Sequence, residues 1–253
     1  MITNNGSLFT QINQGVASIT FGHPSGNSFP SELLQRLVNE LNALSVNEQV
    51  KVIVLKSEGD KIFCSGASFN ELLSIENETQ GLVFFSGFAN VINAMRKCKK
   101  IIVGSVQGKA VGGGVGLIAA CDYVMATEQA AVKLSEISIG IGPFVIQPAI
   151  ERKSGKAAFS HLSLSPQEWK NAYWAEKNGL YAKVFENQKE LEKELDLYTH
   201  QLASYSAEAL SEIKKTLWEG TEDWEDLLIE RAKISGKLVL SENTKKALQQ
   251  FKK

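Results

Sequence analysis

The alternation of short apolar runs with amphipathic segments constrains the fold of this chain most. Residues 52–55 are all apolar and rich in β-branched side chains, which is typical of a strand buried on both faces. Residues 101–106 repeat that pattern. Apolar stripes at helical spacing precede each run, through Leu37 and Leu41 before the first and through Phe84 and Phe88 before the second. Strands separated by helices predict an α/β domain.

The two ends of the chain differ from this middle part. Residues 8–12 and 16–21 flank a short turn and alternate apolar with polar side chains, which predicts a β-hairpin. No strand pattern follows residue 185, and helical stripes dominate instead. We therefore predict a core over residues 1–195 and a helical region over residues 196–253. The apolar stripes of that region either pack on the core or join copies of the chain.

Composition excludes several classes of protein. The net charge of −1 gives no attraction to nucleic acid or to an anionic membrane, and no apolar stretch is long enough to span a bilayer. Three cysteines without paired spacing predict reduced thiols and a cytoplasmic protein. Three histidines lie at no metal-ligand spacing, so no metal is expected.

Two segments place glycines between a predicted strand and a predicted helix. The first is Cys64-Ser65-Gly66-Ala67-Ser68, and the second runs from Gly108 to Gly116 through the triplet Gly112-Gly113-Gly114. Such turns leave unpaired backbone N–H groups at a helix start, where an oxyanion can bind. A dinucleotide fingerprint fails because its third glycine would fall on Leu117. Tight turns alone are the plainer interpretation of either segment taken singly.

A third segment carries a carboxylate. Glu136 follows a predicted strand at residues 131–134 and is flanked by Ile137, Ile139 and Ile141. We expect these apolar neighbours to desolvate the carboxyl group and raise its pKa towards a value useful for proton transfer.

Together, these segments resemble those of the crotonase superfamily, the enoyl-CoA hydratase/isomerase family. The similarity lies in residues 64–67, in the glycine triplet followed by Ala119-Ala120-Cys121-Asp122, and in Ser135-Glu136 followed by residues 140–143. The resemblance implies a right-handed spiral of ββα units with a helical C-terminal region that builds trimers or hexamers. It also implies an acyl-CoA thioester as substrate, with coenzyme A entering as part of that substrate and no separate cofactor.

The resemblance also implies roles for individual residues. The N–H groups of Ala67 and Gly113 correspond to the oxyanion hole, and Glu136 to an acid–base residue. Residues expected to contact the substrate are Ser65, Gly66, Ser68, Gly112, His23 and Pro143. Cys64 is expected in the core and not as a nucleophile.

One departure from the family bears on the reaction. Family hydratases use two glutamates, and the first corresponds to Gly116 in this chain; Ser68 stands where an aspartate is common. A hydratase is the first hypothesis, because the chain is also similar to bacterial hydratases, some assigned to methylglutaconyl-CoA. Alternatives are a 3-enoyl-CoA to 2-enoyl-CoA isomerase using one glutamate, a decarboxylase, and a non-catalytic acyl-CoA binder. A cation could hold a carboxylate on the acyl group, with Lys109 and Arg152 as candidates by residue type only.

Overall fold

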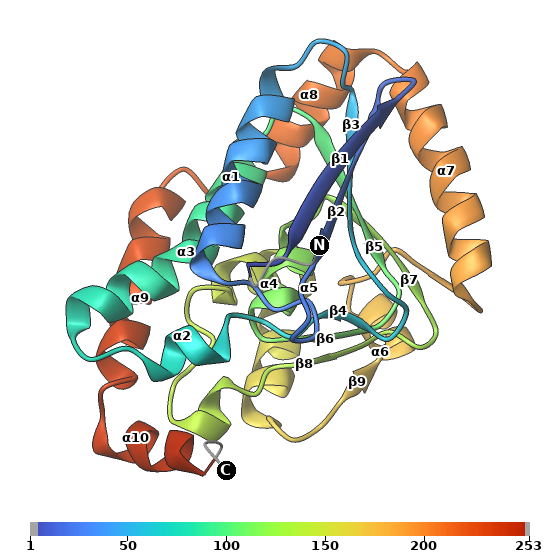
Figure 1. The fold of residues 1–253 in the computed structure, drawn as a ribbon. Helices are drawn as coiled ribbons and strands as arrows, with labels where there is room; N and C mark the ends of the chain where they lie inside the picture. Colours follow the sequence, from blue (N-terminus) through green and yellow to red (C-terminus); the bar gives the residue numbers. More distant parts are fainter. Residues whose placement is uncertain (1–4, 251–253) are drawn as a thin grey trace.

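The computed structural model describes residues 5–250 and contains two β-sheets with helices packed around them (Figure 1). The larger sheet has the order β1-β2-β3-β5-β7-β10, and the smaller has the order β4-β6-β8-β9. All neighbouring strands are parallel except the pairs β1/β2 and β8/β9. The strands are β1 (Ser7–Asn13), β2 (Val16–Gly22), β3 (Val52–Ser57), β4 (Ile62–Cys64), β5 (Ile101–Val106), β6 (Lys109–Val111), β7 (Tyr123–Thr127), β8 (Ala131–Lys133), β9 (Lys170–Asn171) and β10 (Lys183–Phe185).

From β3 to β8 the chain visits the two sheets in turn. Each passage adds one strand to the large sheet and one to the small sheet, and a helical segment follows. This confirms the predicted repeat of ββα units. The helical segments are α2 (Phe69–Leu73) and α3 (Glu78–Lys97) after β4, α4 (Gly113–Ala120) after β6, and the 3₁₀ turn η1 (Glu136–Ile139) with α5 (Gln147–Leu164) after β8.

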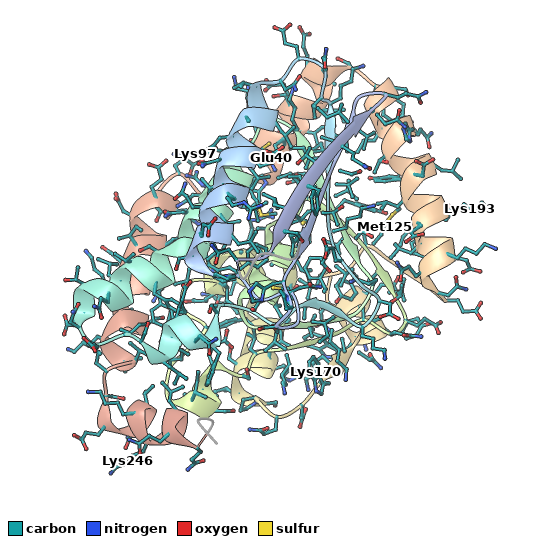
Figure 2. The ribbon with its side chains drawn as sticks, viewed as in Figure 1. Glu40, Lys97, Met125, Lys170, Lys193 and Lys246 are labelled. Atoms are coloured by element: carbon teal, nitrogen blue, oxygen red, sulfur yellow. The ribbon has the colours of Figure 1, made fainter. Side chains whose placement is uncertain are left out.

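The central strands β3 and β5 of the large sheet are buried on both faces, as their apolar runs predict. On one face, Ile53 and Leu55 join a core with α1 (Ser31–Val46), α3 and α4. On the other face, Val52 and Met125 pack against α7 (Gln188–Ser204) and α8 (Ala207–Leu217). Figure 1 shows α1 and α7 on opposite sides of the strands, and Figure 2 labels Met125 between the sheet and α7.

Helix α9 (Trp224–Leu238) packs along α3. The two helices approach so closely that a Cβ built on Gly81 would lie 2.8 Å from the Cα of Gly236. Trp224 and Leu228 of α9 belong to the main apolar core, so this part of the C-terminal stripe packs on its own chain. The boundary predicted at residue 195 falls inside α7, and residues 1–4 and 251–253 lie outside the described part. Among residues 5–250, no helix is both long and apolar enough to cross a membrane.

Some strand boundaries differ from those expected. The apolar pattern of residues 121–126 predicts a strand that begins at Cys121. In the structure the Cys121 N–H instead bonds to the carbonyls of Leu117 and Ile118 and caps α4. Strand β7 therefore starts at Tyr123. Strands β6 and β9 were not predicted, since they span three and two residues. Such segments are too short to show a period of alternation.

Candidate active site

The three segments that stand out in the sequence meet at one cavity of about 600 Å³. The loop between β4 and α2, the turn between β6 and α4, and η1 with the chain after it each supply part of the wall. The predicted site residues that line it are Ser65, Gly66, Ala67, Gly112, Gly113, Glu136 and Pro143. Distant parts of the sequence are brought together because β4, β6 and β8 are neighbours in the small sheet.

Gly66 brings the first two segments into contact. Its φ of 92° lies in the left-handed region, where side chains are strained. A Cβ at this position would lie 3.2 Å from the carbonyl oxygen of Val111 and 3.6 Å from the nitrogen of Gly113. The loop that holds Ala67 therefore lies directly against the start of α4.

The N–H groups of Ala67 and Gly113 are available to a ligand. Gly113 is the first residue of α4, so its N–H has no partner within the helix. Ala67 lies opposite Phe29 in a parallel bridge. The Gly66 carbonyl and the Ser68 N–H make the two hydrogen bonds of this bridge to Phe29, so the Ala67 N–H takes no part in it. Within residues 5–250, neither N–H donates a backbone hydrogen bond. Two donors at adjoining turns can stabilise a developing oxyanion.

Glu136 lies beside this pair of turns. Gly112 adopts φ +53°, and a Cβ there would come within 2.8 Å of the Glu136 Oε1 atom, so a side chain would collide with the carboxylate. The backbone around Glu136 is fixed by bonds from the N–H groups of Gly140 and Ile141 to its carbonyl. Thr244 of α10 (Glu242–Gln249) donates from Oγ1 to the carbonyl of Gly140 at 3.0 Å and holds this turn in place.

Burial raises the pKa of the Glu136 carboxyl group to about 7, although hydrogen bonds from the backbone N–H groups of Glu136 and Ser135 lower it. Its Oε2 atom is shielded from solvent and has no hydrogen-bond partner among the described residues. The expected direction of the shift is confirmed, but its source differs in part. Ile139 and Ile141 line the cavity, whereas Ile137 is 52% exposed.

Most of the remaining wall is apolar. Helix α3 contributes three aromatic rings, and the Phe88 ring lies so close to Gly113 that a Cβ there would approach it to 2.4 Å. Such a lining suits a ligand with an apolar body. The apolar side chains are those of Phe69, Leu72, Phe84, Phe85, Phe88, Val111, Ile139, Ile141, Phe144, Val145 and Ile146.

At position 116, where the resemblance places the first glutamate of family hydratases, this chain has a glycine. A neighbouring side chain fills the space beside it. Gly116 is buried inside α4, and a Cβ there would lie 2.3 Å from Cγ2 of Ile146. Ile146 itself lines the cavity. Its side chain occupies the space that any larger residue at position 116 would need. Within residues 5–250, Glu136 is consequently the only carboxylate in the cavity wall.

We expect Gly116→Ala to destabilise the protein by about 1–3 kcal/mol, because the new methyl group overlaps Ile146 in a packed core. Gly116→Ala should lower the free energy of unfolding less in the Ile146→Ala background, where the space is free, than it does in the unmodified protein. Urea unfolding of all four members of the cycle measures the coupling. Strictly additive effects would show that the two positions do not compete for space.

Other predicted residues lie outside the cavity wall. Ser68 is buried and caps α2 by accepting the N–H of Glu71. His23 contacts its own loop, where Nδ1 lies 3.1 Å from both the Ser25 nitrogen and the Ser28 Oγ atom. Their contacts with coenzyme A stay predictions.

The two cations proposed by residue type do not line the cavity either. Lys109 is exposed on β6. Arg152 stacks on Trp218 and donates to the carbonyl of Leu217. Cys64 is buried with its pKa raised to about 12, which confirms that it belongs to the core.

Several lining residues were not identified as site residues from the sequence, among them Lys133, Ile146 and Gln167. The alternation of Val132 and Lys133 in β8 places their side chains on opposite faces, but it does not say which face borders a cavity. Ile146 and Gln167 carry no local signal.

Comparison with known proteins identifies the family. The model of the enoyl-CoA hydratase/isomerase family matches residues 11–253. The chain is 30% identical over 223 residues to 2,3-dehydroadipyl-CoA hydratase of Escherichia coli (strain K12), covering 85% of this chain and 83% of that protein. The chain therefore belongs to the enoyl-CoA hydratase/isomerase family, within the crotonase superfamily.

Other relatives differ in the reaction that their names state. The peroxisomal Delta(3,5)-Delta(2,4)-dienoyl-CoA isomerase of Arabidopsis thaliana is 29% identical over 192 residues, or 70% of this chain and 67% of that protein. The YngF protein of Bacillus subtilis (strain 168) is 31% identical over 137 residues, so the chain spans about half, 52%, of that relative's length.

A solved structure supports the fold. An enoyl-CoA hydratase from Bacillus halodurans superimposes with a TM-score of 0.89 at 23% identity, covering 96% of this chain and 99% of that one. This confirms the crotonase fold.

Proposed function

We propose that the protein is an acyl-CoA isomerase that moves a double bond from the 3,4 to the 2,3 position, with Glu136 as its single acid–base group. The observation that carries this proposal is the pairing of Gly116 with Ile146. It leaves Glu136 as the only carboxylate in the cavity wall among the described residues. Moving one proton between two carbons requires only one such group.

In this mechanism the thioester carbonyl oxygen accepts hydrogen bonds from the N–H groups of Ala67 and Gly113. These bonds strengthen as negative charge develops on that oxygen. The Glu136 carboxylate takes a proton from C2, and the electron pair delocalises as a dienolate. The protonated Glu136 then returns that proton to C4, which forms the C2=C3 bond and restores the carboxylate.

A hydratase, the first hypothesis from the sequence, is the second candidate. The 2,3-dehydroadipyl-CoA hydratase relative supports it. Hydration would require water to be oriented by something other than a second glutamate, and losing one positioned acid–base group commonly costs about 10²–10⁴-fold in rate. The lining therefore favours isomerisation. A trimeric or hexameric assembly remains part of the proposal.

The discriminating experiment offers 3-hexenoyl-CoA, crotonyl-CoA and 3-methylglutaconyl-CoA in D₂O; it follows water addition by mass and double-bond migration by the absorbance of the conjugated 2-enoyl thioester. Conversion of 3-hexenoyl-CoA to the 2-enoyl ester, without addition of water, is expected. Faster water addition to either 2-enoyl substrate would overturn the isomerase in favour of the hydratase. Binding without turnover of any of the three would point to a decarboxylase or a non-catalytic binder.

The pH dependence provides a second prediction. In the free enzyme Glu136 must be ionised to remove a proton, and its pKa is raised to about 7. We therefore expect kcat/KM for isomerisation to rise with pH and to level off above about pH 7. A profile already flat from pH 5 to 8 would contradict Glu136 as the base. Initial rates across this range, corrected for enzyme stability, measure it.

A further inference from the structure

Lys133 is the only basic residue in the cavity wall among the described residues. It ends β8, three positions before Glu136, and pairs in register with Val111 of β6. Its carbonyl oxygen accepts the N–H of Gly112 at 3.0 Å. The backbone of Lys133 is thus fixed next to the turn that begins α4, and its side chain starts close to the oxyanion-binding N–H groups.

In the described part of the chain, the Lys133 ammonium group contacts an aromatic ring and forms no ion pair. Its Nζ lies 4.6 Å from the ring centroid of Trp169, and the Nζ of Lys109 lies 5.0 Å from the same ring. No carboxylate within residues 5–250 forms an ion pair with either lysine. An indole ring orients a cation but leaves its hydrogen-bond donors free for an anion.

Besides Lys133, the cavity lining includes several uncharged polar side chains. Ser135, Ser138 and Gln167 line the cavity together with Lys133, and the Gln167 Nε2 atom donates to Ser138 Oγ at 3.1 Å. These groups contrast with the aromatic wall that α3 supplies. The cavity lining thus combines apolar side chains with cationic and hydrogen-bonding ones, which fits an acyl group that carries its own anionic group.

We propose that Lys133 binds a second carboxylate on the acyl group, so that the substrate is the monothioester of a dicarboxylic acid. This inference rests on the proposed acyl-CoA function. Lys133 and Glu136 are three residues apart, so their Cα atoms lie at most about 11 Å apart. Gly113, Glu136 and Lys133 line the same cavity, so a short acyl chain whose thioester is held at Gly113 can present its far carboxylate to the lysine.

Binding of saturated, unreactive esters tests the proposal. Each pair has equal chain length: adipyl-CoA against hexanoyl-CoA, and glutaryl-CoA against pentanoyl-CoA. Calorimetry on the full chain should give tighter binding of the dicarboxylic ester in at least one pair, by about 10- to 100-fold. Lys133→Met should abolish this preference and leave the monocarboxylic esters nearly unchanged, while Lys133→Arg should keep much of it.

Lys109→Met is the matched control, because Lys109 shares the Trp169 ring but does not line the cavity. This variant should bind all four esters as the unmodified protein does. Equal affinity within both pairs in the unmodified protein would overturn the proposal. So would an equal loss of all four esters and of free CoA in Lys133→Met, which would assign Lys133 to the CoA phosphates.

These outcomes are independent of the isomerase assay. Binding of saturated esters needs no proton transfer, so a preference can be present even where 3-hexenoyl-CoA is not isomerised. Conversely, rapid isomerisation without any preference between the paired esters would leave the proposed function intact and refute only the role of Lys133.

Discussion

Glu136→Gln is expected to lower kcat for isomerisation by about 10²–10⁴-fold while acyl-CoA affinity stays nearly constant. The amide has almost the same shape as the carboxyl group, but it cannot take a proton from C2. The loss should therefore appear in kcat and not in the dissociation constant of a saturated ester. Steady-state kinetics and calorimetry with hexanoyl-CoA measure the two quantities.

The same substitution should stabilise the folded protein at high pH. The pKa of Glu136 is raised from about 4.5 to about 7, so the folded state binds the proton more tightly than the unfolded state does. Stability is lost as pH rises between these values, because an ionised carboxylate must stay in a desolvated site. Glu136→Gln removes that cost, and we expect a gain of about 1–3 kcal/mol at pH 8 and little gain at pH 4.5.

Thermal unfolding at both pH values provides the check. Glu136→Asp is a suitable control variant, because it keeps the charge but shortens the side chain by one methylene group. Turnover close to that of the unmodified protein in Glu136→Gln would remove Glu136 from the mechanism. A stability gain equal at pH 4.5 and pH 8 would show that its origin is not the ionised carboxylate.

Gly113→Pro is expected to reduce turnover by about 10²–10³-fold, because proline has no N–H to donate to the oxyanion. Proline is otherwise tolerated at the first position of a helix, which Gly113 occupies. The structure adds a complication, since any Cβ at this position approaches the Phe88 ring to 2.4 Å. The proline variant alone therefore cannot separate a lost donor from a displaced ring.

Gly113→Ala resolves this ambiguity. It introduces the same Cβ but keeps the N–H, so the ratio of turnover between the alanine and proline variants reports the donor. Both should be compared in the Phe88→Ala background, where the ring is absent, and their circular dichroism should match. Equal turnover of the two variants in that background would mean that another group binds the carbonyl oxygen.

The sequence by itself determined which segments form the site. Gly66 and Gly112 adopt positive φ, a conformation that favours glycine. The sequence therefore marks both turns by a glycine between a strand and a helix. The buried strands of the large sheet were predictable because continuous apolar runs reflect burial on both faces. Each of these features depends on a few neighbouring residues, which is why a local pattern suffices.

Only the tertiary structure decided which side chain fills the space beside Gly116 and which lysine lines the cavity. Ile146 lies 30 positions after Gly116 in the chain, yet its side chain fills the space beside that glycine. No local pattern distinguishes Lys133 from other lysines on short strands. The order β4-β6-β8-β9 brings its strand beside the other segments of the site, and Lys133 lines the cavity. Both facts depend on how separate elements pack. A local pattern carries the period of a strand or helix, but not the identity of the element that packs against it.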